Sequence, residues 1–524
     1  MVSFSLPSRR RLQEEWPFAA ALCLLALAWL FSLLPGNRFA LPFRAYVINS
    51  PLFNLPHIPE GLFLMMAGGA ALLCYRSGPY RKLWLTGWWL SLGTLCFLLL
   101  SIRFLRFRMF GLLPFYAGLR FQRSLAVISV LVIVAAGQLT LVYQAVRKKR
   151  RTWFFLAMVL FAWVITLLSN GIEGNLKAAT IRTFSQYRLT DYYANIVQVN
   201  TEFIFHYARV MPRLNLHPAT HPPLAVLFLW LLQRLGLGII GSSLVVSLCG
   251  SLTLLPASGI ARELFGEREA IITAAVFPLV PVFIIYSAVS LDALFMLLST
   301  LAVWGFVLLL KRKQSVLVSA LLFSLALFST FMDFFLLPLF FLLDLGIKYF
   351  PNGPDGLKPL NLKQVAAWAG TVAAFYLGMY LLFNYNLVEV FLTAKSYNDR
   401  IFALGARPYL YWVGGNLVDY FVYLGIPLSA LLSLDLKEIW QRRSISGKDA
   451  PLAAVLFTLL VLTFSGLIKR EVARVWMVFT PFLLAALSGY INRVFGEDRR
   501  AFVIMLAALF SQALVFESFL DSLW

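Results

Sequence analysis

The stretch RKKRRTWFFLAMVLFAWVITLLSN, residues 147–170, sets five basic residues directly before nineteen residues that carry no charge. About 20 apolar residues in a helix cross the hydrocarbon core of a bilayer. Lys and Arg collect in the cytoplasmic loops of membrane proteins. We therefore expect residues 152–169 to form a transmembrane helix that leaves the cytoplasm, so that the polar segment after it is extracytoplasmic.

The composition of the whole chain agrees with this reading. Of 524 residues, 60% are hydrophobic and only 13% are charged, and the mean hydropathy is +0.79. One soluble core could not bury so much apolar surface. We predict an all-α polytopic integral membrane protein with about fifteen transmembrane helices and one re-entrant or juxtamembrane helix.

The chain carries a formal net charge of +21, from 45 Lys and Arg against 24 Asp and Glu. In a soluble protein such an excess would suggest nucleic-acid binding. In a polytopic protein it is expected of short cytoplasmic loops that face anionic lipids. No basic stretch with interleaved aromatic residues lies outside the apolar runs, so we expect no nucleic-acid partner.

Apolar length and charge together divide one transmembrane domain, residues 1–524, into three parts. These are N-terminal helices within 1–150, a large extracytoplasmic loop at 171–223, and a helical core at 224–524. The expected spans are 16–34, 60–75, 83–101, 124–145, 152–169, 240–258, 268–287, 292–310, 314–331, 334–349, 364–384, 408–432, 451–468, 475–491 and a last helix that ends near 519. The arginine-rich loop 103–123 falls on the outer side and has no explanation in this scheme.

The loop 171–223 holds the polar sequences RLTDYYANIVQ (188–198) and LHPATHPPL (216–224). The apolar run 222–238 follows it, has only about 17 residues and begins with two prolines. The next span, 240–258, must run inward to reach the basic loop 261–268. Both ends of the run 222–238 must therefore lie on the outer side of the membrane. We therefore expect it to be a re-entrant or surface helix.

Ionisable groups at a membrane boundary are costly and mark functional sites. When successive spans alternate in direction and the basic loops lie inside, many ionisable residues fall on the outer face. These are Asp191, His217, His221, Asp292, Asp333, Lys395, Asp399, Arg400, Arg407, Lys469, Arg470, Glu471 and Arg474. Arginines can hold a phosphate while a carboxylate takes a proton from a hydroxyl. This mixture suits a reaction on a phosphorylated lipid.

The order of these residues resembles the GT-C superfamily of membrane glycosyltransferases. It comprises an acid in the first large outer loop (Asp191), the box HPPL at 221–224, the basic inner loop ARELFGER at 261–268, and SAVSLD at 287–292. The resemblance covers about residues 150–310. The segment KREVARVWMVFTP at 469–481 is similar to an E-x-x-R-x-W box of some bacterial members, and RPYLYWVGGNLVDY at 407–420 to their preceding element.

The resemblance implies transfer of a sugar from a polyprenyl-phosphate carrier to an acceptor outside the membrane, with inversion at the anomeric carbon. Asp191 would be the general base and Asp292 a second acidic group that positions the acceptor or a cation. We assign substrate binding to the following residues: His217, His221, Arg400, Arg407, Glu471 and Arg474. No cofactor is implied with certainty, and a divalent cation stays an open alternative.

Each assignment has a simpler rival. Asp191 could cap a surface helix, and Asp292 could cap the helix that it opens. Glu471 with Arg474 could be an ordinary i, i+3 ion pair. Arg400 and Arg407 could anchor lipid headgroups. His217 and His221 have the spacing of two metal ligands on one helix face, but the intervening and following prolines prevent a regular helix.

The main rival function is a transporter or flippase of lipid-linked sugars, which would also need an outer cavity with arginines. Paired broken helices in two related halves would favour it. For the enzyme we expect a bacterial-type cytoplasmic membrane, with the active site on the extracytoplasmic side and an acceptor that is a glycan, a lipid or a protein. The sequence gives neither the sugar nor the acceptor.

Overall fold

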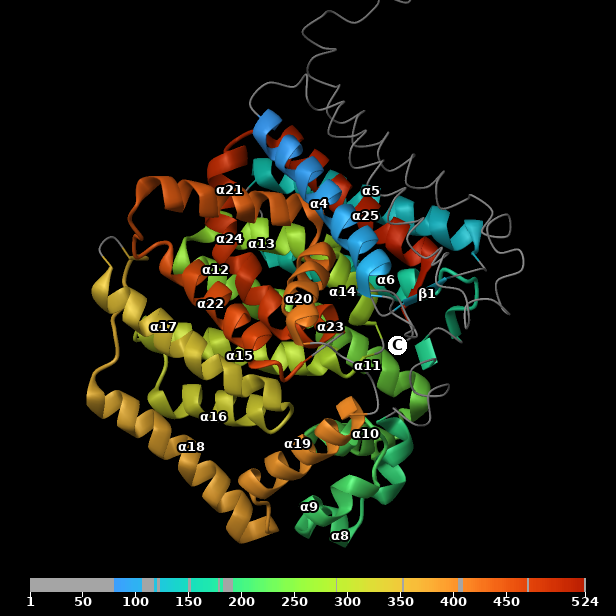
Figure 1. Ribbon diagram of the computed structural model, residues 1–524, viewed down its shortest axis with the longest axis vertical. Coiled ribbons are helices and arrows are strands. Elements are labelled where there is room, and N and C mark those ends of the chain that lie inside the picture. Colours follow the sequence, from blue (N-terminus) through green and yellow to red (C-terminus); the bar gives the residue numbers. More distant parts are fainter. Residues whose placement is uncertain are drawn as a thin grey trace, which may run out of the picture.

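The computed structural model describes residues 80–105, 117–119, 123–148, 152–177, 180–181, 192–288, 290–350, 353–403, 409–468 and 471–522. Helices make up nearly all of its regular structure (Figure 1). Two strands of three residues, β1 (Ala117–Leu119) and β2 (Leu520–Ser522), pair antiparallel. The prediction of an all-α membrane fold is confirmed, although its first two expected spans lie outside the described residues.

The α-helices in chain order are α4 (Arg81–Leu105), α5 (Leu125–Lys148), α6 (Thr152–Asn170), α8 (Thr201–Phe205), α9 (Tyr207–Val210), α10 (Leu224–Arg234), α11 (Gly238–Leu252), α12 (Leu254–Leu264), α13 (Glu267–Val276), α14 (Pro281–Tyr286), α15 (Asp292–Leu310), α16 (Val316–Leu327), α17 (Leu336–Tyr349), α18 (Leu362–Phe383), α19 (Leu387–Ala403), α20 (Tyr409–Leu424), α21 (Ile426–Arg442), α22 (Ala450–Ser465), α23 (Val472–Val475), α24 (Thr480–Phe495) and α25 (Arg499–Phe519). Short 3₁₀ turns, η3 (Tyr193–Gln198), η4 (Met211–Arg213), η5 (Pro218–Thr220), η6 (Phe277–Leu279), η7 (Phe331–Phe335) and η8 (Trp476–Phe479), connect several of them.

Helix α15 lies at the centre of the packing. It contacts α11, α12, α16 and η8, and most of its side chains are buried. Burying apolar side chains is the main stabilising contribution to such packing. Since α15 is held on several sides, the residues at its two ends have fixed positions.

The structure tests the expected number of transmembrane helices only for the part of the chain that it describes. Within the described residues, 7 helical segments are long and apolar enough, or 8 if the bent pair α20–α21 forms one span. The expected count of about fifteen is therefore not confirmed. Helix α16 has 12 residues and α17 has 14, which is shorter than the roughly 20 residues that cross the hydrocarbon core.

Two predicted spans are broken in the structure. The run 268–287 divides into α13, η6 and α14, because Pro278 and Pro281 cannot donate backbone hydrogen bonds. The run 408–432 bends by 113° between α20 and α21. Gly425 at this bend has φ +106°, a conformation that side chains with a Cβ rarely adopt.

Helix α19 corrects another expectation, because residues 385–407 were expected to be an outer loop. The helix begins after Asn386, whose side-chain oxygen accepts bonds from the backbone N–H groups of Val388 (3.1 Å) and Glu389 (3.3 Å). The charged residues of α19 lower its hydropathy below that of a transmembrane helix. A search for long apolar runs therefore does not find an amphipathic helix of this kind. Helix α19 contacts α9, η4 and η5, and Figure 1 shows its label near those of α9 and α10.

Loops that were predicted on the inner side lie together at one end of the helices. Lys313 forms an ion pair with Glu263 at 2.7 Å, and Asn492 donates to Glu269 at 2.6 Å. These contacts join the loop 261–268, which was predicted on the inner side, to the end of α15, and the start of α13 to α24. Since α15 leads away from this end to Asp292, the candidate site lies at the opposite end.

Candidate active site

Asp292 is the first residue of α15 and is only 8% exposed. The hydroxyl of Ser290 donates to its carboxylate, and the backbone N–H of Asp292 donates back to the same hydroxyl at 3.1 Å. A carboxylate at a helix N-terminus is favoured by the helix dipole. Asp292 therefore has both a fixed orientation and an environment that supports a negative charge.

Arg474 connects Asp292 to a second carboxylate. Its Nη1 lies 2.8 Å from Asp292 Oδ2, and its Nη2 lies 3.0 Å from Glu471 Oε2. The side chain of Arg474 is 10% exposed, so water screens these pairs little. Two carboxylates and one guanidinium give this cluster a formal charge of −1. Because Arg474 forms an ion pair with each carboxylate, it fixes the orientation of both acids.

The turn that carries Glu471 and Arg474 is itself held from α20. Asp419, buried in the middle of α20, accepts a bond from the backbone N–H of Ala473 at 2.9 Å. Glu471 has φ +60°, in the left-handed region that residues other than glycine and asparagine seldom adopt. Residues held in such conformations are often found at functional sites.

The histidine-containing segment 217–223 is fixed by one buried tyrosine. The hydroxyl of Tyr207 donates to the carbonyl oxygens of Pro218 at 3.1 Å and His221 at 2.8 Å. Pro218 begins the turn η5, and Pro222 and Pro223 follow it. The prolines give a rigid turn and no regular helix, so the two histidines do not share a helix face.

His221 lies against the first turn of α15. Its ring stacks on that of Phe295, with centroids 5.1 Å apart and an interplanar angle of 16°. Burial lowers the pKa of His221 to about 4, while Asp292 opposes this shift and Arg474 adds to it. The imidazole is therefore neutral at physiological pH and can either donate or accept a hydrogen bond.

Tyr192 joins the two histidines and was not predicted as a site residue. Its ring lies 6.0 Å from those of both His217 and His221, and 6.3 Å from that of Phe295. Burial raises the pKa of its hydroxyl well above 10, and the charge of Asp292 adds to this effect. Its place directly after Asp191 was the available signal in the sequence, and Tyr192 itself lies near the head of α15 through its contact with Phe295.

The structure groups some of the expected site residues and separates others. Asp292, Glu471 and Arg474 form the ion cluster, and His217 and His221 line its aromatic side. Arg400 lies on α19 in a separate groove. Asp191 and Arg407 lie outside the described residues, so their assignments stay predictions.

The described residues contain no group of three or more His, Cys, Asp or Glu side chains that could hold a metal ion. The pair His217 and His221 has Tyr192 between its rings and is no such group. What the cluster offers is oriented carboxylates beside a neutral imidazole. Such groups can accept a proton from a hydroxyl or form hydrogen bonds to a sugar.

Part of this site lies in a segment that is similar to a known family. Residues 220–348 match the family described as dolichyl-phosphate-mannose-protein mannosyltransferase, which belongs to the GT-C superfamily. The match includes His221 and Asp292, and it confirms the resemblance stated from the sequence. No curated protein matches the chain significantly. The family and the apolar helices together indicate a multi-pass membrane glycosyltransferase.

Proposed function

We propose that this chain, whose residues 220–348 are similar to a GT-C mannosyltransferase family, transfers a sugar from a polyprenyl-phosphate carrier to an acceptor hydroxyl. The transfer takes place on the extracytoplasmic side of the cytoplasmic membrane and inverts the anomeric carbon. The acceptor is a glycan, a lipid or a protein that carries the hydroxyl. This is the function that the site supports best.

One observation carries the proposal: the buried cluster of Asp292, Arg474 and Glu471 at the head of α15. Charged groups at this depth are expensive in a membrane protein and are kept for function. The cluster combines residues 182 positions apart in the chain. Two of the segments singled out for their likeness to GT-C enzymes therefore meet at one point.

The proposed chemistry needs one base and one leaving group. The carboxylate of Asp191 takes the proton of the acceptor hydroxyl, and the acceptor oxygen forms a bond to the anomeric carbon. The bond from that carbon to the phosphate oxygen breaks on the opposite face, and polyprenyl phosphate leaves with the electron pair. Attack opposite the leaving group gives the inverted product.

The remaining residues position the reactants in this proposal. Asp292 accepts a hydrogen bond from a hydroxyl of the acceptor, in an orientation set by Ser290 and Arg474. Neutral His221 and His217 contact the sugar, while Arg400 and Arg407 hold the carrier phosphate or the acceptor. Arg474 is a positioning residue, because its ion pairs with Asp292 and Glu471 are made with carboxylates of the protein itself.

The positions of the loops support the proposed side of the membrane. Segments with basic clusters, at 261–268 and 311–313, share one end of the fold through Lys313 and Glu263. The acidic site lies at the other end of α15. Since basic loops mark the cytoplasmic side, this arrangement favours an extracytoplasmic site.

The transporter hypothesis would be favoured by paired broken helices. Within the described residues, the one strongly bent pair long enough for a span is α20 with α21. A transporter also leaves the sugar–phosphate bond intact, whereas the enzyme breaks it. Cleavage of the bond between the sugar and the carrier phosphate therefore distinguishes the enzyme from the transporter.

The test is to incubate the purified full chain, in lipid nanodiscs, with radiolabelled polyprenyl-phosphate sugars and to follow release of the sugar from the carrier. We expect the wild type to consume at least one donor and Asp191→Asn to remain folded without consuming it. Consumption by Asp191→Asn at the wild-type rate would remove the base assignment. Repeating the assay with EDTA tests the open question of a divalent cation.

A further inference from the structure

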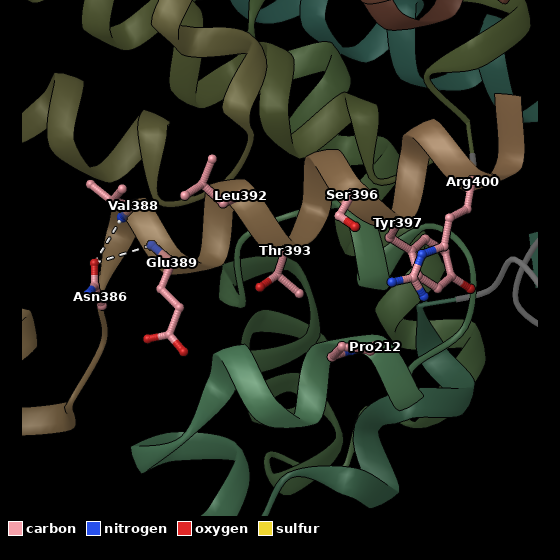
Figure 2. A pocket seen from close by; sticks show the side chains of 9 residues that line it. All are labelled: Pro212, Asn386, Val388, Glu389, Leu392, Thr393, Ser396, Tyr397 and Arg400. Atoms are coloured by element: carbon pink, nitrogen blue, oxygen red, sulfur yellow. Dashed lines mark hydrogen bonds between the residues drawn. The ribbon is translucent and has the colours of Figure 1, made fainter. Parts of the chain in front are cut away.

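A groove separate from the ion cluster runs along α19. Its volume is about 570 Å³, and Pro212 of η4 lies opposite the helix. Figure 2 shows Glu389, Thr393, Tyr397 and Arg400 along the helix, with Glu389 near one end and Arg400 near the other. Ligand sites in proteins commonly have volumes of roughly 300–1,000 Å³.

The polar residues of the groove repeat at helical spacing. Glu389, Thr393, Tyr397 and Arg400 follow one another at intervals of four, four and three residues, which places them on one face of α19. Eleven residues separate Glu389 from Arg400, so the groove extends about 16 Å at 1.5 Å per residue. It is long enough for an extended ligand with polar groups along its length.

The charges on α19 differ in their partners. Lys395 pairs with Asp399 at 2.7 Å, beside the groove. Glu389 and Arg400 form no ion pair within the described residues, although both are exposed. Charged side chains that line a groove without pairing are available to a ligand.

The groove is close to the proposed active site. Helix α19 packs against η5 as well as η4, and η5 ends directly before His221. His221 in turn stacks on Phe295, one turn after Asp292. A ligand in the groove would therefore lie next to the segment that lines the ion cluster.

We propose that this groove binds the carbohydrate part of the acceptor, so that the acceptor is a glycan or a glycosylated molecule. The inference rests on the proposed function, because it names the acceptor of that transfer. Hydroxyl, carboxylate and guanidinium groups on one face can each form hydrogen bonds to sugar hydroxyls. Tyr397 adds an aromatic surface with a polar end, which suits the mixed apolar and polar surface of a sugar ring.

A peptide fits these walls less well. Extended peptides are commonly bound through backbone hydrogen bonds to a free strand edge. Here one wall is the helix α19 and the other is the turn η4, so the interior of α19 already uses its backbone N–H and C=O groups. Recognition must come from side chains, and a ligand with a hydroxyl on almost every carbon answers that requirement.

The test measures binding of neutral trisaccharides of mannose, glucose and N-acetylglucosamine to the full chain in nanodiscs by saturation-transfer NMR. A serine-rich hexapeptide and inorganic phosphate serve as competing probes. Thr393→Val and Tyr397→Ala change the groove, and Thr371→Val on α18, outside the groove, is the matched control. We expect at least one trisaccharide to bind, both groove variants to weaken it at least tenfold, and the control to bind like the wild type.

The inference is overturned if no trisaccharide binds, if the groove variants bind like the wild type, or if only the peptide or phosphate loses binding in them. Donor consumption in the presence of the same trisaccharides is measured on the same samples. If the wild type does not consume any donor, the proposed function is contradicted. Trisaccharide binding still tests the groove in that case. The two failures are therefore distinguishable.

Discussion

Arg474 joins two carboxylates that come from different parts of the chain, with Asp292 at 2.8 Å and Glu471 at 3.0 Å. The first contact connects α15 to α23 across 182 residues, and the second is local. Because the guanidinium donates in several directions in one plane, it can hold both acids in a fixed relation. Lysine could not reproduce that geometry.

Replacing Arg474 by Gln should destabilise the protein. The variant leaves Asp292 buried without its cation, and breaking a buried ion pair from one side costs about 3–5 kcal/mol. Thermal unfolding in nanodiscs measures this loss. The matched control is Arg213→Gln, whose pair with Glu202 at 3.4 Å is exposed and should change stability by less than about 1 kcal/mol. An Arg474→Gln variant that unfolds like the control would show that the cluster does not fix the site.

Residue 471 allows the backbone effect to be separated from the charge. Both Glu471→Ala and Glu471→Gly remove the carboxylate, but only glycine adopts φ +60° without strain. The glycine variant should therefore be more stable than the alanine variant by about 1 kcal/mol. Comparing their unfolding midpoints in one detergent measures the difference. Equal midpoints, or a more stable alanine variant, would contradict the left-handed conformation.

The bend between α20 and α21 depends on Gly425 and Gln512. Gln512 accepts from the backbone N–H of Ile426 at 2.8 Å and donates to the carbonyl of Val422 at 2.7 Å, while a Cβ at Gly425 would collide with Leu509. Gln512→Leu leaves the buried N–H of Ile426 without this partner, which costs about 1–3 kcal/mol, whereas the carbonyl of Val422 keeps its bond from the backbone N–H of Gly425 at 3.1 Å. Unfolding measurements should show Gln512→Leu destabilised by at least about 1 kcal/mol. Wild-type stability in Gln512→Leu would rule out this role.

His221 predicts a pH dependence. Its pKa in the folded protein is lowered from 6.5 to about 4, with burial as the largest cause. Between those values the unfolded state binds more protons than the folded state, so stability falls as the pH drops from about 6.5 to about 4. Above that window the contribution is fully present. NMR of labelled histidines should show one imidazole that stays neutral at pH 5, and His221→Gln should remove that signal. If the signal that His221→Gln removes titrates near pH 6.5 in the wild type, the prediction that His221 stays neutral at pH 5 is wrong.

The sequence predicted the uninterrupted helices well and the broken ones poorly. Residues 152–169 and 292–310 were expected as helices, and the structure has α6 at Thr152–Asn170 and α15 at Asp292–Leu310. Both runs are uniformly apolar and have clear ends. Hydropathy averages over about twenty residues, so it could not show the break near Pro281, the bend at Gly425, or the amphipathic α19.

For the site, the distribution of basic residues in the loops predicts which residues lie on the same side of the membrane. It does not predict which of them are in contact. It placed Asp292, Glu471 and Arg474 on one face, yet their contact depends on the packing of η8 against α15. Tyr192 was missed because an aromatic residue in a loop carries no charge signal. Arg400 had been grouped with the site residues, and the structure places it in the groove along α19.

The central claim is that the carboxylate of Asp292 belongs to a site that removes sugar from a polyprenyl-phosphate carrier. The most direct measurement compares donor consumption by the wild type, Asp292→Asn and the control Lys395→Gln, each shown to be folded by its thermal unfolding. Asparagine keeps the size of the side chain and can still accept from Ser290, but it has no negative charge. We expect consumption by Asp292→Asn to be slower by about tenfold or more, because a hydrogen bond to a charged group contributes about 1.5–3 kcal/mol against about 1 kcal/mol for a neutral one, and a wild-type rate for Lys395→Gln. Consumption by folded Asp292→Asn within twofold of the wild type would contradict the account.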